Sequence, residues 1–485
     1  MEGADSAKES TTPVLPGYDE KEKPASDKEE HSFNAAMIDS YKTGTSSPDS
    51  TKIFYTENIG APIRYVIAGV EGRVNESLYQ SVRDFVFSPN SEHYGYKALA
   101  DDKWTAVIDG KEGQKYDEVY KIIFSQDGER YAYMADKDGQ RIAVVDGREE
   151  GPYQSTSGDP VVSSGGQHVL YDIVKDGTNY VVVDGQVQEE IGWNSVVSSD
   201  GSRWAYSRGA AYVGDPCYIV LDGEVMDLGN DNSVRQKVFS QDGRHFAYVL
   251  APGAGAYSDQ VAVVDGVQGK AYPFPGIGKI TYSHDGERAA YSAKAKDAGF
   301  MMVLDGVEGR TYDEVRDPLF SPEGGHLAYA ARDKDGWFAV LNGDEGRRYL
   351  DIWGLALSND GRLAYVARDS REGKDVRLVV VDGQEENAYR YDWYGQGIKS
   401  GPLFSPDGKH TVYTANDGGS AEYTVVDGLQ HLMPWAHMGG LNWGEGSPIV
   451  FDSDNEFHYL AVNDTGTYIV RFKIPSAAAS EPLAN

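Results

Sequence analysis

The chain has 485 residues, of which 40% are hydrophobic, and a formal net charge of −31. A nucleic-acid-binding protein concentrates Lys and Arg along a groove, so this acidity argues against a nucleic-acid partner. No apolar run approaches the roughly 18 residues that a membrane-spanning helix needs. The single cysteine, Cys217, excludes an intrachain disulfide and a Cys-rich metal site.

The first segment, residues 1–31, is predicted to be a disordered acidic tail, because it holds nine acidic residues and little that could be buried. No apolar signal core follows Met1. We therefore expect either a cytoplasmic protein or one whose export signal has been removed. The next run, "SFNAAMID" at residues 32–39, has the pattern of a strand without a neighbouring partner.

From residue 45 onward the chain repeats a module of about 40 residues. The stretch "LFSPDGKHTVYTA" shows the pattern: one strand, a Ser-x-Asp-Gly turn, and a second strand with a tyrosine seven or eight residues after the serine. The turn recurs at Ser47, Ser88, Ser125, Ser163, Ser198, Ser240, Ser283, Ser321, Ser358, Ser405 and, in degenerate form, Asp452. A second turn of the type "VVDG" closes each module.

Each module is predicted to contain four strands. Strand a ends at the Ser-x-Asp-Gly turn, strand b carries the tyrosine, strand c ends in "VVDG", and strand d is the short "YDxV"-like segment. Asp-Gly suits the hairpin corners because Asp hydrogen-bonds its own downstream backbone and Gly accepts a positive φ. A small residue, such as Ala132 before Tyr133, lies on the sheet face opposite the tyrosine. Stacked sheets could therefore set large side chains against small ones.

The count of turns predicts ten complete modules and a partial eleventh, which stops after a strand c, "TYIVRFKIP". Residues 32–39 are expected to supply the missing strand and so to cover both sheet edges. The predicted fold is an all-β β-propeller over residues 32–475, followed by a flexible tail at 476–485. The count allows one large ring or two fused propellers, and a β-solenoid is the structural alternative.

The "FSPDGKHxxYxA…VVVDG" pattern resembles the WD-like propeller repeats of TolB-type proteins, whose hallmark is Ser-Pro-Asp-Gly. The resemblance covers about residues 45 to 473. It implies a protein-interaction platform in the periplasm or at the cell surface, whereas composition alone would also allow the cytoplasm. Similar blades occur in prolyl-peptidase-like enzymes and in some pectin-degrading lyases, but no hydrolase domain follows the blades here.

No catalytic motif was found. The Gly-x-Ser-x-Gly elbow, His-Glu-x-x-His, the phosphate-binding loop and the dinucleotide fingerprint are all absent from the sequence. "DKDG" at 136–139 and 333–336 lacks the third and fourth ligands of a calcium loop, so a solvated turn is expected. We therefore predict no catalytic residue, no metal and no cofactor.

Five histidines occupy one repeat position, five residues after the module serine, where other modules carry Arg130, Arg203 and Arg288. They are His93, His168, His245, His326 and His410. A position that accepts His or Arg is predicted to be structural. Because these side chains are spread around a ring, they should not converge on one metal.

The connections between strands are expected to lie on two opposite rims of the propeller. The a–b and c–d corners form one rim, here called the Asp-Gly rim, and the b–c and d–a connections form the other, called the variable rim. Unusual aromatic residues fall near the predicted d–a connections, and exposed Trp and Tyr are typical of interaction hot spots. The predicted binding residues are Trp353, Trp393, Tyr394, Trp435, His437, Trp443 and Glu445.

The leading hypothesis is a non-catalytic platform that binds a protein or peptide on the variable rim. One alternative is a polysaccharide lyase or glycosidase, which would need a polar cluster such as His437 and Glu445 with a metal or a paired carboxylate. Another is a carbohydrate-binding module that stacks sugars on its tryptophans. The two kinds of binder differ in whether the tryptophans lie flat in a groove or surround a broad apolar patch.

Overall fold

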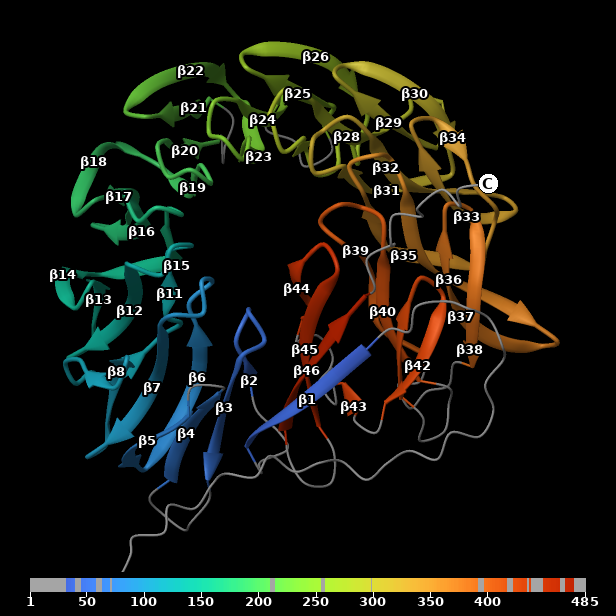
Figure 1. Ribbon diagram of the computed structural model, residues 1–485. Coiled ribbons are helices and arrows are strands. Elements are labelled where there is room, and N and C mark those ends of the chain that lie inside the picture. Colours follow the sequence, from blue (N-terminus) through green and yellow to red (C-terminus); the bar gives the residue numbers. More distant parts are fainter. Residues whose placement is uncertain are drawn as a thin grey trace, which may run out of the picture.

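The computed structural model describes residues 32–39, 45–57, 63–69, 72–209, 214–253, 258–297, 299–390, 397–416, 422–433, 436–437, 448–462 and 467–474. Within these residues every regular element is a β-strand, and the strands form eleven antiparallel sheets. The sheets follow one another around a ring (Figure 1). The predicted all-β propeller is therefore confirmed. The predicted tails, 1–31 and 476–485, lie outside the described residues.

The first six blades follow the chain in order. Blade 1 holds β2 (Thr45–Ser46), β3 (Lys52–Glu57), β4 (Ile63–Gly69) and β5 (Gly72–Tyr79). Blade 2 holds β6 (Ser81–Phe87), β7 (Tyr94–Ala100), β8 (Lys103–Ile108) and β9 (Lys111–Glu112). Blade 3 holds β10 (Glu118–Val119), β11 (Ile123–Phe124), β12 (Tyr131–Lys137), β13 (Gln140–Val145) and β14 (Arg148–Tyr153). Blade 4 holds β15 (Ser155–Val162), β16 (Val169–Lys175), β17 (Thr178–Val183) and β18 (Gln186–Ile191). Blade 5 holds β19 (Trp193–Val197), β20 (Trp204–Arg208), β21 (Pro216–Leu221) and β22 (Glu224–Asn230). Blade 6 holds β23 (Ser233–Phe239), β24 (Phe246–Ala251), β25 (Gln260–Val264) and β26 (Val267–Tyr272).

The remaining blades complete the ring. Blade 7 holds β27 (Thr281–Tyr282), β28 (Ala289–Lys294), β29 (Phe300–Leu304) and β30 (Val307–Tyr312). Blade 8 holds β31 (Glu314–Phe320), β32 (Leu327–Asp333), β33 (Gly336–Leu341) and β34 (Asp344–Glu345). Blade 9 holds β35 (Asp351–Leu357), β36 (Leu363–Arg371), β37 (Lys374–Val381) and β38 (Gln384–Arg390). Blade 10 holds β39 (Gly397–Phe404), β40 (Thr411–Asn416), β41 (Glu422–Val426) and β42 (Leu429–Met433). Blade 11 holds β43 (Ala436–His437), β44 (Val450–Ser453), β45 (Glu456–Val462), β46 (Thr467–Lys473) and β1 (Ser32–Asp39).

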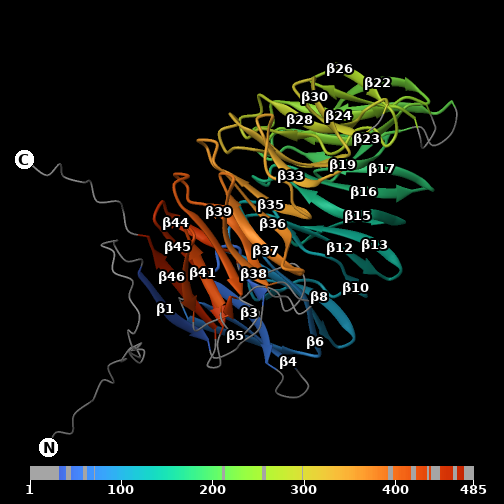
Figure 2. The same cartoon turned by 90° about the vertical axis from the view of Figure 1, so that its right-hand side faces the viewer.

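The last blade is closed by the N-terminal strand, as the sequence predicted. β1 pairs antiparallel with β46, from Ser32 opposite Lys473 to Asp39 opposite Thr467. Figure 2 shows the two strands side by side at the seam of the ring. Blade 11 also contacts blade 1, because Ser50 Oγ donates to the carbonyl of Pro448 at 2.7 Å. The chain therefore forms one ring of eleven blades rather than two fused propellers.

Strand d differs from the prediction. It begins directly after the Asp-Gly corner, as β30 does at Val307, and it ends at the tyrosine of the "YDxV" segment. The Asp of that segment is already bonded to the next blade: Asp117 N donates to the carbonyl of Asp136 at 2.8 Å, and β10 then pairs with β12. The d–a connection is therefore very short, and the predicted extent of strand d was wrong.

The interfaces between blades set tyrosines against small residues, as predicted. Tyr291 of blade 7 is 3% exposed and packs with Ala247 and Ala262 of blade 6. Its hydroxyl would lie 3.5 Å from a Cβ added to Gly269, which sits in strand d of blade 6. Burial of such a side chain contributes roughly 1.5–3 kcal/mol, so the ring is held together mainly by these interfaces.

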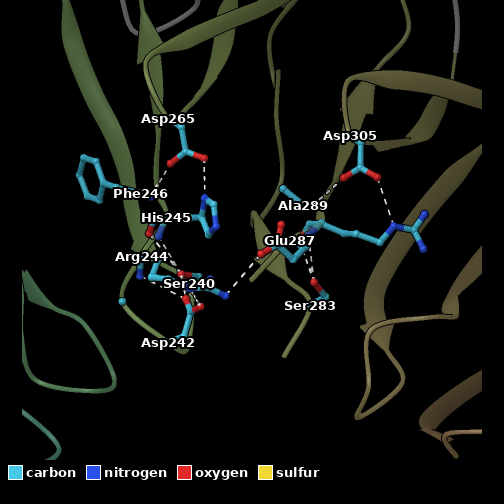
Figure 3. A network of polar contacts seen from close by, with 12 residues as sticks. Ser240, Asp242, Arg244, His245, Phe246, Asp265, Ser283, Glu287, Ala289 and Asp305 are labelled. Atoms are coloured by element: carbon cyan, nitrogen blue, oxygen red, sulfur yellow. Dashed lines mark hydrogen bonds and ion pairs between the residues drawn. The ribbon is translucent and has the colours of Figure 1, made fainter. Parts of the chain in front are cut away.

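The Asp-Gly rim is tied by one hydrogen-bond pattern, which Figure 3 shows for blades 6 and 7. Ser240 Oγ donates to Asp242 at 2.6 Å and accepts from the backbone N–H of His245 at 3.0 Å. His245 Nδ1 lies 2.8 Å from Asp265. The same carboxylate accepts from the backbone N–H of Phe246 at 2.9 Å. These bonds pin the start of strand b to the end of strand c.

The His-or-Arg position alternates from blade 2 to blade 10: His in blades 2, 4, 6, 8 and 10, and Arg in blades 3, 5, 7 and 9. The longer arginine also reaches the next blade: Arg130 Nη1 donates to the carbonyl of Gly166 at 2.5 Å, and Arg362 Nη1 to that of Lys409 at 2.6 Å. Both residue types bond the Asp-Gly corner of their own blade, or Asn342 in blade 8. The position is structural, as its repetition predicted.

Candidate functional site

The predicted binding residues are only partly described by the structure. Trp353 is placed with its side chain, and His437 is placed as the second residue of β43. Trp393, Tyr394, Trp435, Trp443 and Glu445 lie outside the described residues. The site is therefore built here from Trp353 and the side chains around it.

Trp353 lies within strand a of blade 9 rather than in a d–a loop. It is the third residue of β35, and its ring packs partly buried against the core between blades 9 and 10. Trp193 is likewise the first residue of β19, the innermost strand of blade 5. Both lie at the start of strand a because strand a begins almost where the preceding strand d ends.

Trp353 occupies a repeat position at the entry to a β-bulge. The register of β35 against β36 shifts between Trp353 and Ala356, and Gly354 between them has φ +61°. Blade 8 repeats this arrangement, with a register shift after Arg316 and a φ of +57° at Asp317. A bulge re-aims side chains and interrupts the ladder, so the same device recurs on strands a next to the variable rim.

In two neighbouring blades an arginine lies close to a tryptophan ring, but the two residues stand on opposite strands in the two blades. In blade 8 the guanidinium of Arg316 on strand a lies 3.9 Å from the ring centre of Trp337 on strand c. In blade 9 the ring is on strand a and the cation on strand c, with Arg377 at 5.2 Å from Trp353. Arg377 and Trp337 are equivalent positions, because each lies opposite the arginine three residues after the strand-b tyrosine. A pair of this kind contributes roughly 0.5–2 kcal/mol.

Charged side chains surround these pairs and neutralise one another. Arg316 Nη2 lies 2.6 Å from Asp351 of blade 9 and also donates to the carbonyl of Ile352 at 2.8 Å. Arg316 and Asp351 are each 39% exposed. We call Arg316, Trp337, Asp351, Trp353 and Arg377 the blade 8–9 sector. Trp337 is buried in it, with 8% exposed, whereas Trp353, Arg316 and Arg377 are partly exposed, and all are held on strands.

Carboxylates of the two "DKDG" segments are hydrogen-bonded to other groups of the protein. Asp136 accepts from Arg141 at 2.7 Å and from the hydroxyl of Tyr120 at 2.8 Å. Asp333 accepts from Arg348 at 2.9 Å and from the backbone N–H of Asp335. Because Asp138 and Gly139 both have positive φ, the first segment is a two-residue hairpin turn. This geometry is that of the turn that the sequence predicted.

One histidine meets two carboxylates on the Asp-Gly rim. Ligand atoms of Glu92, His93 and Glu129 lie within 4.8 Å of one another, across the junction of blades 2 and 3. His93 Nδ1 is bonded to Asp109 at 2.7 Å. Sequence reasoning considered only the histidines and missed this group, whose signal is a Glu four residues after the serine in two successive modules. Both glutamates are exposed, and the group lies far along the chain from the predicted binding residues.

A buried serine–lysine pair lies between blades 5 and 6. Lys237 Nζ donates to Ser207 Oγ at 2.7 Å, and the two residues are 7% and 3% exposed. Burial lowers the pKa of Lys237 to about 8, which is a range suited to a general base. Both side chains are nonetheless enclosed by protein, so the pair is built as an internal polar contact between blades.

No family model and no curated protein matches this chain. Among solved structures, a eukaryotic initiation factor is 11% identical, with 69% of this chain and 92% of that chain covered and a TM-score of 0.36. The GH74 enzyme of Niastella koreensis is 12% identical, with 79% and 77% covered and a TM-score of 0.27. TolB from Acinetobacter baumannii is 14% identical, with 61% and 78% covered and a TM-score of 0.21. At these values the likenesses carry no argument about activity. No helix that could cross a membrane occurs in the part of the chain that the structure describes.

Proposed function

We propose that this protein is a non-catalytic binding platform whose variable rim docks a protein or peptide partner. The observation that supports this proposal most is the blade 8–9 sector, where Trp353, Arg316 and Arg377 are partly exposed yet held on strands rather than on loops. Trp, Tyr and Arg dominate the binding energy of protein interfaces when they are anchored in this way. The predicted residues Trp393, Tyr394, Trp435, His437, Trp443 and Glu445 would extend the same docking surface.

An enzyme is less well supported by the described residues. Arg316 and Asp351 of the blade 8–9 sector form an ion pair with each other, and the sector as defined holds no histidine or nucleophile. The carbohydrate-binding alternative also finds less support, because Arg377 lies near the Trp353 ring. A sugar platform needs a bare ring face, whereas a peptide can contact the ring edge and the guanidinium together.

The location that we propose is the periplasm or the cell surface, and it rests on the resemblance of the repeat to TolB-type blades. External protease treatment of intact producing cells, with an antibody against the chain, tests it. Cleavage in intact cells, or after opening of the outer membrane alone, supports the proposal. Cleavage that requires complete lysis would place the protein in the cytoplasm.

The binding proposal is tested by selecting peptides from a random display library on the full chain and measuring their affinity for variants by calorimetry. Trp393→Ala and Trp443→Ala should each weaken a selected peptide by about 2 kcal/mol and leave the melting temperature unchanged. Lys409→Ala, on the Asp-Gly rim, is the control and should change neither value. Peptides that bind all three variants as they bind the wild type would contradict the proposed rim. Selective retention on a glycan array instead of peptides would favour the carbohydrate alternative.

A further inference from the structure

A cavity of about 620 Å³ lies in the wedge between blades 6 and 7, near the Asp-Gly rim. The residues that line it include Ala262, Val264, Tyr282, Ala289, Tyr291 and Gly306. Figure 3 shows its surroundings, with His245 and Asp265 on the blade 6 side and Ala289 and Asp305 on the blade 7 side. Exposed residues, among them Val267 and Lys270, also line the cavity, so a ligand could enter from solvent.

The cavity is larger than the equivalent one at blade 3 because blade 7 lacks a large side chain at a repeat position. The residue that follows the His or Arg of the Asp-Gly rim is alanine, Ala289, in blade 7. The same position carries Tyr94, Tyr131, Val169, Trp204, Phe246, Leu327, Leu363 and Thr411 in the other blades from 2 to 10. Ala289 is thus the smallest member of the set, at a buried point of the wedge.

Blade 3 shows what the missing side chain does elsewhere. The ring of Tyr131 lies parallel to that of Tyr133, with centroids 6.4 Å apart and an interplanar angle of 3°. Its hydroxyl would lie 3.2 Å from a Cβ on Gly147, whereas no atom lies within 4 Å of a Cβ on the equivalent Gly306. The wedge that Tyr131 lines is smaller, about 440 Å³. Blade 7 therefore leaves open the place of a planar ring beside Tyr291.

A residue that lines the same cavity carries a buried hydroxyl without a hydrogen-bond partner. Tyr282 precedes the turn serine of blade 7, at a position occupied by Phe in blades 2, 3, 6, 8 and 10. Its hydroxyl is buried, makes no hydrogen bond within the described residues, and its residue lines the cavity. A buried donor left unpaired costs free energy, so a ligand that supplies an acceptor there would be favoured.

The charged groups around the cavity are already paired. His245 bonds Asp265 at 2.8 Å, and Arg288 bonds Asp305 at 3.2 Å. Lys270 bonds Glu308 at 2.7 Å, and Glu287 lies 3.4 Å from Arg244. A charged ligand would have to break one of these pairs or enter without a counter-ion. The surroundings therefore favour an uncharged ligand.

We propose that this wedge is a binding site for a small, neutral, planar aromatic molecule that carries a hydrogen-bond acceptor. The ring takes the place of the side chain that Ala289 lacks and lies parallel to Tyr291. The acceptor receives the hydrogen bond of the Tyr282 hydroxyl. The site lies near the Asp-Gly rim, so it is independent of the partner proposed for the variable rim.

Benzamide is the probe, because it combines an uncharged ring with a carbonyl acceptor, and cyclohexanecarboxamide is the matched non-planar control. Binding to the full chain is followed by saturation-transfer NMR and by titration. Benzamide should bind the wild type with a Kd on the order of 1 mM, and the control should bind about tenfold more weakly. Equal binding of the two amides, or no saturable binding of benzamide, would overturn the proposal.

Two variants locate the site. Ala289→Tyr restores the ring that blade 3 carries and should weaken benzamide binding at least tenfold, because it fills the place beside Tyr291, without lowering the melting temperature. Tyr282→Phe installs the residue of five other blades and should weaken binding about fivefold through loss of the hydroxyl alone. If Ala289→Tyr fails to fold, Ala289→Leu, which copies blades 8 and 9, takes its place. Unchanged affinity in a folded Ala289 variant would contradict the site.

Discussion

The two rims are made from the ends of the same four strands, yet they differ in what the sequence repeats. On the Asp-Gly rim a serine, an aspartate and a His or Arg recur with the same bonds from blade to blade, as in blades 6 and 7 (Figure 3). On the variable rim the bulge position holds Arg316 in one blade and Trp353 in the next. The comparison teaches that the repeated residues support the fold, and it is consistent with our proposal that a partner binds where the chain departs from the repeat.

The largest effect should follow from breaking the ring itself. Deleting residues 1–30 should leave stability nearly unchanged, whereas deleting residues 1–39 should reduce the free energy of unfolding by about 4 kcal/mol or more. The second truncation removes β1 and exposes the edge of β46. Thermal and urea unfolding of the two truncations measure the difference. Equal stability of the two would contradict closure by β1.

The next effect concerns the tyrosines between blades. Tyr248→Ala and Tyr329→Ala should each cost about 3 kcal/mol, because both rings are 6% exposed and leave cavities when removed. Trp353→Ala should cost less, about 1–2 kcal/mol, since its ring is only partly buried against the core and loses in addition the contact with Arg377. Urea denaturation gives all three values. A tryptophan variant as unstable as the tyrosine variants would assign that ring to the core.

Acid should loosen the Asp-Gly rim over a defined interval. The hydrogen bond from Ser240 lowers the pKa of Asp242 from 3.8 to about 2, and the serines of blades 7 and 9 act in the same direction on Asp285 and Asp360. The unfolded chain therefore binds more protons in this range, so stability is full above about pH 4 and is lost as the pH falls towards 2. Asp242 is 27% exposed, and solvent screening keeps its share below about 1 kcal/mol.

Melting curves between pH 5 and pH 2 measure this loss. Asp242→Asn keeps an acceptor for the serine but cannot titrate, so its curve should be shallower than that of the wild type. A wild-type melting temperature that stays constant down to pH 2 would show that the turn carboxylates contribute nothing.

The smallest effect tests the alternation of His and Arg. His168→Arg should change the free energy of unfolding by less than about 0.5 kcal/mol, because Arg203 in the next blade makes the equivalent bond to Asp222 at 2.7 Å. Thermal unfolding at neutral pH gives the comparison. A loss of more than about 2 kcal/mol would show that the position distinguishes the two residues and is more than a structural tether.

Much of the fold could be predicted because its determinants are local. Turn chemistry fixed the corners, and the period fixed the number of blades and the missing strand that β1 supplies. The start of strand a could not be predicted from the "YDxV" segment. Its tyrosine, Tyr116, is the last residue that pairs within strand d of its own blade. The next residue, Asp117, is already hydrogen-bonded to the following blade.

The candidate sites were harder to predict because they depend on residues distant in the chain. The stacking of Arg316 on Trp337 joins strands a and c, so no short motif records it. The cavity beside Ala289 arises from a side chain that is too small, and a missing group leaves no motif to search for. Both become visible only when equivalent positions of successive blades are compared in three dimensions.

The double swap Trp353→Arg with Arg377→Trp tests most directly whether departures from the repeat carry binding rather than the fold. It gives blade 9 the arrangement of blade 8, where Arg316 lies on Trp337. Melting temperature and affinity for a peptide selected on the wild type are measured on the same preparation. The swapped chain should melt within about 2 °C of the wild type and bind the peptide at least tenfold more weakly. A swapped chain that unfolds, or that keeps its full affinity, would contradict the account.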